Sequence, residues 1–111
     1  MDIEIKAREL ADLLVNGDVY KRYIAARKEI AKEPELKAKV DEFRKKNFFM
    51  QNEDNQHKFD DLKKLKSDYY EIMADKRVKR YLDSELILCR TIQRINAILV
   101  ENLDVDVSFI S

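Results

Sequence analysis

Glycine and proline are almost absent from this chain, since each occurs once in 111 residues, and tryptophan does not occur. Turns between β-strands depend heavily on glycine and proline, so a chain with so little of either is poorly suited to building a sheet. Lysine, glutamate, aspartate, leucine, isoleucine and alanine dominate instead, a composition typical of helical proteins. The sequence therefore predicts an all-α fold, and its length predicts a single helical domain over residues 1–111.

Cysteine and histidine also occur once each, as Cys89 and His57. A single cysteine cannot form a disulfide within the chain, and one cysteine with one histidine cannot build a zinc site. One glycine excludes the glycine-rich loops that bind phosphates and the turn that presents a catalytic serine. We therefore predict no metal, no cofactor and no enzymatic activity. Because Cys89 falls on an apolar helix face, we interpret it as an inert thiol in the core.

A long apolar run and an N-terminal signal peptide are missing too, so we predict a soluble cytoplasmic protein without membrane contact. The 22 basic and 22 acidic residues cancel, and each half of the chain is balanced by itself. A balanced chain has no long-range field to attract nucleic acid or an anionic membrane. Any such binding would need a local patch.

Apolar residues recur every three or four positions through most of the chain, which predicts about five helices. We expect Gly17 to end the first helix in a left-handed conformation and Asp18 to cap the second. Pro34 favours the first turn of the third helix. A weak break at Asp75 either kinks the chain or caps the last helix. The expected helices cover residues 2–15, 18–32, 34–50, 59–72 and 76–103.

The polar segment 51–57 is the richest turn sequence in the chain and predicts the tip of an antiparallel helical hairpin. The apolar residues on either side of it follow the spacing of a short coiled-coil seam. We expect the third and fourth helices to form this hairpin, the last helix to pack along it, and the first two helices to close one end of the bundle.

Glu85 falls in the middle of the apolar face of the last helix, where a carboxylate is costly unless it is paired, hydrogen-bonded or hydrated. A catalytic acid would need a second carboxylate, a histidine or a metal nearby, and His57 is expected at the distant hairpin tip. We therefore interpret Glu85 as a structural group that pairs with Arg27, with Arg44 or with a tyrosine hydroxyl. The alternative is a carboxylate that contacts a ligand.

Two amides interrupt apolar seams in a similar way, Asn96 in the last helix and Asn47 in the third. Buried amides often fix the register or the oligomeric state of packed helices at some cost in stability. We predict this role for both residues, with partial exposure as the alternative.

Four apolar residues lie away from the predicted seams: Phe48 and Phe49 in the third helix, and Ile87 and Ile98 in the last. A helix with apolar residues on several sides is usually covered on several sides. We therefore predict that these four residues contact another subunit or a partner. Since Phe48 and Phe49 adjoin the basic residues 44–46, a base-stacking surface is the alternative.

Basic residues cluster at residues 44–46 and again at residues 76–80. We interpret the second cluster as a solvated face around Val78, which itself belongs to the apolar face of the last helix. Either cluster could instead bind phosphate groups. Direct RNA binding is thus the alternative to a function based on protein contacts.

Three segments of the chain resemble a known family: ARELADLL (7–14), VYKRYIAARKEIAKEPELKAKVDEFRKKNFFMQ (19–51) and VKRYLDSELILCRTIQRINAIL (78–99). They are similar to the YlbF/YmcA family of bacterial regulators. The EF pair of the family corresponds to Glu42 and Phe43, its dpel segment to residues 33–36, and its AE glutamate to Glu85. The chain departs from the pattern at Ser84, where alanine is usual, and at Asn47, where glutamine is common.

This resemblance implies an all-α helical hairpin that associates with itself or with related proteins. It also implies a role in competence, sporulation and biofilm control, in a complex that assists a messenger-processing endoribonuclease. Certain members carry a cysteine-rich C-terminal tail linked to iron–sulfur binding, whereas this chain ends in DVDVSFIS. The resemblance therefore carries no iron–sulfur role over to this chain.

Overall fold

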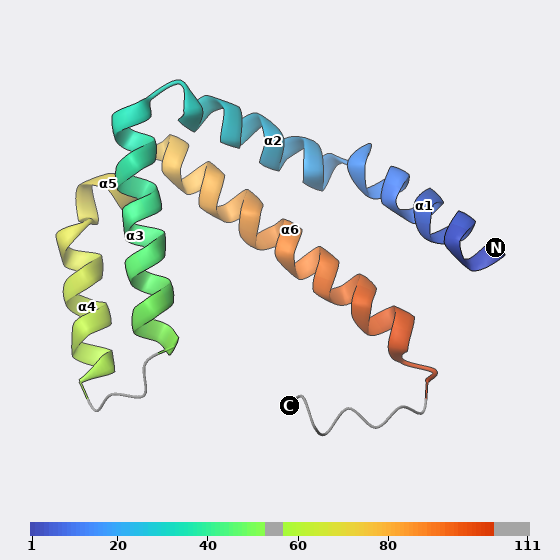
Figure 1. The fold of residues 1–111 in the computed structure, drawn as a ribbon. Coiled ribbons are helices and arrows are strands. Elements are labelled where there is room, and N and C mark those ends of the chain that lie inside the picture. Colours follow the sequence, from blue (N-terminus) through green and yellow to red (C-terminus); the bar gives the residue numbers. More distant parts are fainter. Residues whose placement is uncertain (53–56, 104–111) are drawn as a thin grey trace.

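The computed structural model describes residues 1–52 and 57–103, and these residues form six α-helices and no strand. The all-α prediction is confirmed. The tip of the expected hairpin (53–56) and the C-terminal segment (104–111) lie outside the described residues. The helices, labelled in Figure 1, are α1 (Asp2–Val15), α2 (Asp18–Ala31), α3 (Pro34–Asn52), α4 (Lys58–Asp68), α5 (Tyr70–Ala74) and α6 (Lys76–Val100).

One helix more than expected is present, because the helix predicted over residues 59–72 is divided. The division falls at Tyr69, whose backbone angles (φ −108°, ψ 20°) lie outside the helical region. The short helix α5 then leads directly into Asp75 and α6. The chain therefore changes direction twice within a few residues, and this is where the hairpin is joined to the last helix.

Asp75 caps α6 and does not merely kink the chain. Its carboxylate accepts the backbone N–H of Arg77 at 2.8 Å and pairs with the guanidinium of the same residue at 2.9 Å. These hydrogen bonds from Arg77 lower the pKa of Asp75 to about 2. Pro34 begins α3, as the sequence predicts. Both helix starts follow from local chemistry that the sequence displays directly.

The junction between α1 and α2 corrects a prediction about Gly17. This residue is not left-handed, since its angles are φ −85° and ψ 161°, and it is Gly17, not Asp18, that caps α2. An extended conformation is open to any residue, so glycine is not required by the backbone angles. A Cβ here would lie 3.1 Å from the carbonyl oxygen of Leu13. Glycine therefore provides the space for a close turn over the end of α1.

The helices form two arms that diverge from a common junction (Figure 1). One arm is the hairpin of α3 and α4. In the other arm α2 packs along α6, and α1 continues from α2 and diverges from α6 toward the N-terminus. The last helix therefore packs against α2 and α5 and does not pack along the hairpin, which corrects the predicted arrangement. The molecule is flat, with extents of 50 × 38 × 16 Å.

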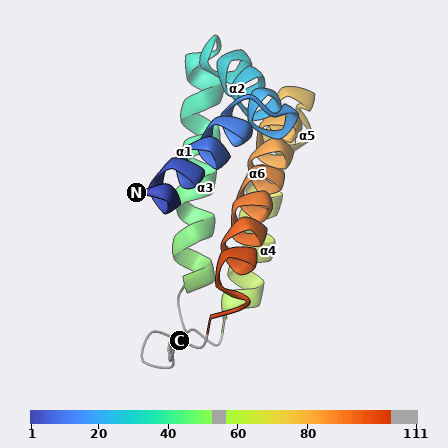
Figure 2. The same cartoon turned by 90° about the vertical axis from the view of Figure 1, so that its right-hand side faces the viewer.

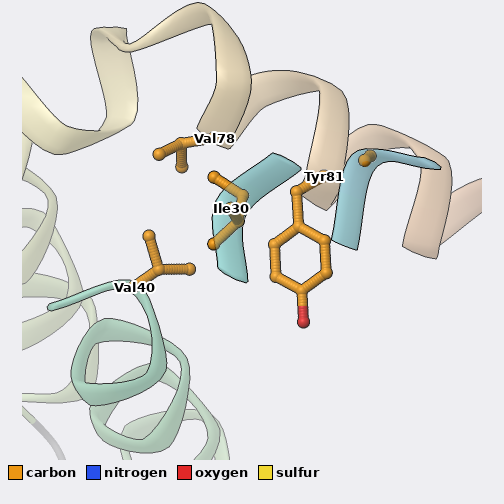
Figure 3. Packing of buried hydrophobic residues seen from close by; sticks show 5 residues of the cluster. Ile30, Val40, Val78 and Tyr81 are labelled. Carbon is orange, nitrogen blue, oxygen red and sulfur yellow. The ribbon is translucent and has the colours of Figure 1, made fainter. Parts of the chain in front are cut away.

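The buried core lies at the junction of the two arms. Figure 3 shows Ile30 from α2, Val40 from α3, and Val78 and Tyr81 from α6 packed around one another. Ala26 completes the cluster, and none of the five side chains is more than 6% exposed. The consecutive helices α2 and α3 are thereby joined to α6, which is distant from them in the sequence.

Beyond this junction the apolar face of α6 is left uncovered. Leu99 and Leu103 are each 60% exposed, and Cys89 is exposed, so the prediction of a core thiol is wrong. On the hairpin, Phe59 is 78% exposed, although the spacing places it in the expected seam. On α6 the physical reason is that the partner helix expected from the pattern is not packed there, whereas Phe59 lies at the open end of the hairpin, in the first turn of α4.

Candidate functional site

Glu85 is held by Arg44, which confirms one of its three expected partners. Arg44 Nη2 donates to both carboxylate oxygens of Glu85, at 2.5 and 2.6 Å, and Arg44 Nη1 donates to the hydroxyl of Tyr81 at 3.0 Å. The side chains of Arg44 and Glu85 are 36% and 25% exposed, so the pair is only partly desolvated. This clamp ties α3 of the hairpin to α6 of the other arm, beside the core.

A stack of aromatic rings continues the clamp into α2. The rings of Tyr81 and Tyr23 lie 6.0 Å apart and are nearly parallel, with 21° between their planes. Arg44 lies over one end of the stack, 5.4 Å from the centre of the Tyr81 ring, and Arg27 lies over the Tyr23 ring at 5.5 Å. Burial raises the pKa of the Tyr81 hydroxyl. Arg27 thus contributes to the junction without pairing with Glu85.

A second polar contact fixes the break between α4 and α5. Lys46 Nζ donates to the hydroxyl of Tyr69 at 2.9 Å and pairs with Glu42 at 3.0 Å, while the rings of Tyr69 and the buried Phe43 lie 5.5 Å apart. The hydrogen bond to Tyr69, followed by that to Glu42, raises the pKa of Lys46, and the bond from Lys46 lowers the pKa of Glu42. Glu42 and Phe43 are thus both used to close the hairpin.

The basic clusters are partly neutralised by ion pairs with carboxylates. In residues 76–80, Arg77 pairs with Glu33 at 3.3 Å and Arg80 pairs with Glu29 at 2.6 Å, while Val78 is fully buried between them. In residues 44–46, both Arg44 and Lys46 have carboxylate partners. A phosphate group would have to compete with these pairs, which weakens the case for a nucleic-acid surface.

The structure brings Asn47, Phe48, Phe49 and Glu85 together in one hollow. It lies between α3 and α6, has a volume of about 570 Å³, and is lined by Phe43, Arg44, Lys45, Asn47, Phe48, Phe49, Gln51, Leu82 and Glu85. The rings of Phe48 and Phe49 meet edge to face with their centres 5.8 Å apart, and the two side chains are 63% and 55% exposed. The hollow therefore places two exposed aromatic rings beside the Arg44–Glu85 ion pair.

Ile87 and Ile98 lie elsewhere, although both are exposed as predicted. Ile87 lines a smaller groove of about 390 Å³ between α2 and α6, together with Val19 and Ala25. Ile98 lies near the C-terminal end of α6 and lines none of the grooves described here. The four predicted contact residues therefore do not form one continuous surface.

The two amides are less buried than the spacing predicts. Asn96 is exposed in this chain, because no helix covers that part of α6, so the prediction that it is buried is wrong for the single chain. Asn47 is half-buried, and its side-chain oxygen accepts a hydrogen bond from Gln51 in the same helix at 3.3 Å. Whether either residue fixes a register therefore depends on a partner chain and stays a prediction.

Sequence reasoning missed the central position of Tyr81 in this site. A signal was present, because Tyr81 precedes Glu85 by four residues and so shares its helix face. Within residues 1–52 and 57–103, no three His, Cys, Asp or Glu side chains gather where they could hold a metal ion. In the same part of the chain, no helix is both long and apolar enough to span a membrane.

The fold and the site together define an all-α protein whose main surface features are exposed apolar patches held in place by an ion-paired junction. More particularly, the chain belongs to the YlbF/YmcA family: the profile described as "Control of competence regulator ComK, YlbF/YmcA" matches residues 3–104. This confirms the resemblance drawn from the three sequence segments. The family description is that of a regulator of competence control.

Two curated relatives, both called "UPF0342 protein", support the assignment. One, from Caldicellulosiruptor bescii, is 28% identical over 101 residues, covering 88% of this chain and 85% of that protein. The other, from Caldicellulosiruptor saccharolyticus, is 31% identical over 101 residues, covering 88% and 84%. No solved structure gives a significant match. Neither the family description nor the names of these relatives mention an enzymatic activity.

Proposed function

We propose that this protein is a non-enzymatic regulatory adaptor that acts through protein contacts in the control of competence, sporulation and biofilm formation. The observation that carries the proposal is the hollow between α3 and α6, where Phe48 and Phe49 are exposed on α3 next to the Arg44–Glu85 clamp. Exposed aromatic side chains on a fixed backbone are the usual anchors of protein interfaces, because they bury large area at little cost in conformational entropy.

The partners that we propose follow from the family. They are further copies of this chain or related helical proteins, in a cytoplasmic complex that assists a messenger-processing endoribonuclease. In this proposal the chain supplies a binding surface and the endoribonuclease supplies the chemistry. Glu85 has a structural role, because its carboxylate is already engaged by two hydrogen bonds from Arg44.

The test is capture of the tagged protein from its native cytosol, with and without ribonuclease, followed by mass spectrometry. We expect a related helical protein or an endoribonuclease to be recovered in both conditions, and to be lost with the double variant F48S/F49S. The matched control is F59S/Y70S, which removes two aromatic side chains that are 78% and 71% exposed outside the hollow. It should capture the same proteins as the wild type.

Two results would contradict the proposal. If F48S/F49S captures the same proteins as the wild type, the hollow is not the contact surface. Recovery that disappears after ribonuclease treatment would favour direct RNA binding instead, and affinity for RNA should then fall steeply with salt because phosphate contacts release counterions.

A further inference from the structure

An open apolar groove lies between α1 and the C-terminal half of α6. Its volume is about 630 Å³, and its walls are apolar except for Asp2 and Lys6. Figures 1 and 2 show from two directions that α1 diverges from α6 toward its N-terminus. Ile3 on the α1 wall is 77% exposed, and Leu99 on the α6 wall is 60% exposed. The groove therefore opens to solvent beside the last turn of α6.

The chain leaves α6 at this open end. The helix ends at Val100, and the N–H of Leu103 donates to the carbonyl oxygen of Val100 at 3.0 Å, so the chain passes through a tight turn. The residues that follow are the C-terminal segment 104–111, DVDVSFIS. A short segment tethered beside a groove meets it at an effective concentration in the millimolar range, whatever the concentration of the protein.

The C-terminal segment alternates between polar and apolar residues. The apolar residues are Val105, Val107 and Phe109, and the residues between them are Asp104, Asp106 and Ser108. A period of two is typical of an extended chain with one apolar side, and valine favours this conformation. Successive side chains of an extended chain point to opposite sides. The pattern therefore predicts one uncharged side, which suits the apolar walls of the groove, and one side whose carboxylates stay in water.

The segment is also long enough to lie along the groove. An extended chain advances about 3.3 Å per residue, so residues 104–109 span about 20 Å. Ile92, on the α6 wall at the far end of the groove from Leu99, precedes Val100 by about 12 Å at 1.5 Å per residue. The difference in length is available for the chain to reverse its direction after α6.

We propose that the C-terminal segment 104–111 docks on this groove and acts as a built-in cover, with Val105, Val107 and Phe109 against the apolar walls. Each of these side chains favours docking by roughly 10- to 100-fold when it is buried. Ordering the backbone of the segment opposes docking by a comparable total factor. The docked and released states are therefore nearly balanced, and a protein that packs against this groove has only a weak contact to displace.

The cover is separate from the features already described. The family profile matches residues 3–104, so residues 105–111 lie beyond the part of the chain that the family shares. The groove is also distinct from the hollow that contains Phe48 and Phe49. The inference thus adds a regulated surface to the proposed adaptor and does not depend on the partner that the hollow binds.

The test measures how fast a single thiol in the groove reacts with a maleimide. C89S removes the exposed native thiol, and A7C then places one thiol on the α1 wall, where Ala7 is exposed. A docked segment shields this thiol and a released one does not. I5C is the matched control, because Ile5 is 53% exposed, does not line the groove and lies on the opposite face of the same helix.

The decisive comparison is F109S with I110S in the C89S/A7C chain at low protein concentration. These neighbouring apolar residues fall on opposite sides of an extended segment. We expect F109S to raise the rate about twofold, because a roughly 10- to 100-fold loss in docking releases the half of the molecules that were covered. I110S should leave the rate unchanged, and neither substitution should alter the rate for I5C. Circular dichroism should show unchanged helix content in every variant.

Three results would overturn the inference. If A7C reacts equally fast with the wild-type segment, F109S and I110S, the segment does not cover the groove. Equal acceleration by F109S and I110S would exclude the extended arrangement. Protection that F109S does not relieve and that fades on dilution would identify a second copy as the occupant, since docking of a tethered segment is independent of concentration. The capture experiment tests the adaptor function separately, because it depends on Phe48 and Phe49.

Discussion

Replacing Glu85 with glutamine should destabilise the protein, because it removes the charge that Arg44 clamps. Glutamine has nearly the same shape, so the change tests the ion pair and not the packing. It leaves Arg44 with one neutral acceptor in place of a carboxylate that takes hydrogen bonds of 2.5 and 2.6 Å. Charge-assisted hydrogen bonds are shorter and stronger than neutral ones, so the loss should be measurable.

The magnitude follows from how far the pair is removed from water. Fully exposed ion pairs contribute about 0.2–1 kcal/mol, whereas removing one partner of a buried pair costs about 3–5 kcal/mol. Arg44 and Glu85 are 36% and 25% exposed, which places them between these limits. We expect a loss of about 1–2 kcal/mol in the free energy of unfolding, and a fall of about 5–10 °C in Tm for a chain of this length.

The assay is thermal and urea unfolding followed by circular dichroism at one fixed protein concentration. D83N is the matched control, since Asp83 is an exposed carboxylate two residues earlier in the same helix and should have almost no effect. A double-mutant cycle of E85Q with R44M should give a coupling of at least about 0.5 kcal/mol. If E85Q melts like the wild type and the cycle shows no coupling, Glu85 does not hold α6 to the hairpin.

Two further predictions concern the junction. V78A should lower the free energy of unfolding by about 2 kcal/mol, because Val78 is fully buried. The control V100A, at a residue of the same helix that is 58% exposed, should change it by less than about 0.5 kcal/mol. Equal effects of the two variants in urea unfolding would refute the position of the core. D75N should remove the part of the pH dependence of Tm that arises from ionisation of Asp75. The pKa of Asp75 is lowered on folding from 3.8 to about 2, so its contribution is complete above pH 3.8 and is lost as the pH falls through about 2. The gap in Tm between wild type and D75N should therefore shrink over that range, and a constant gap would contradict the cap.

Features that depend on neighbouring residues follow well from the sequence. Pro34 and Asp75 begin helices where their chemistry predicts, and the polar segment separates α3 from α4. Gly17 was the exception. The sequence predicts a turn there, but it does not tell whether glycine is needed for a left-handed backbone or because a side chain would not fit. Most helix starts are thus local properties. The break at Tyr69 was not predicted, because it involves a contact with Lys46 of α3.

Features that depend on which helices meet do not follow from the sequence alone. Periodicity shows that α6 has an apolar face, but it does not say whether α2, the hairpin or a second chain covers it. The same uncertainty left Arg27, Arg44 and a tyrosine as alternatives for Glu85, and the geometry of the junction selects Arg44 together with Tyr81. The same argument predicts that Cys89 and Asn96 are buried. Both residues lie on the apolar face of α6, but both are exposed in the single chain.

The location of the core has a consequence for how the chain is made. Ile30 and Val40 come from the first half of the sequence, whereas Val78 and Tyr81, which cover them, come from the second. During synthesis, the apolar residues of α2 and α3 at the junction stay in water until α6 has left the ribosome. Docking of α6 on α2 is then the step that closes the molecule, and a chain cut before residue 78 would lack the cluster that joins the two arms.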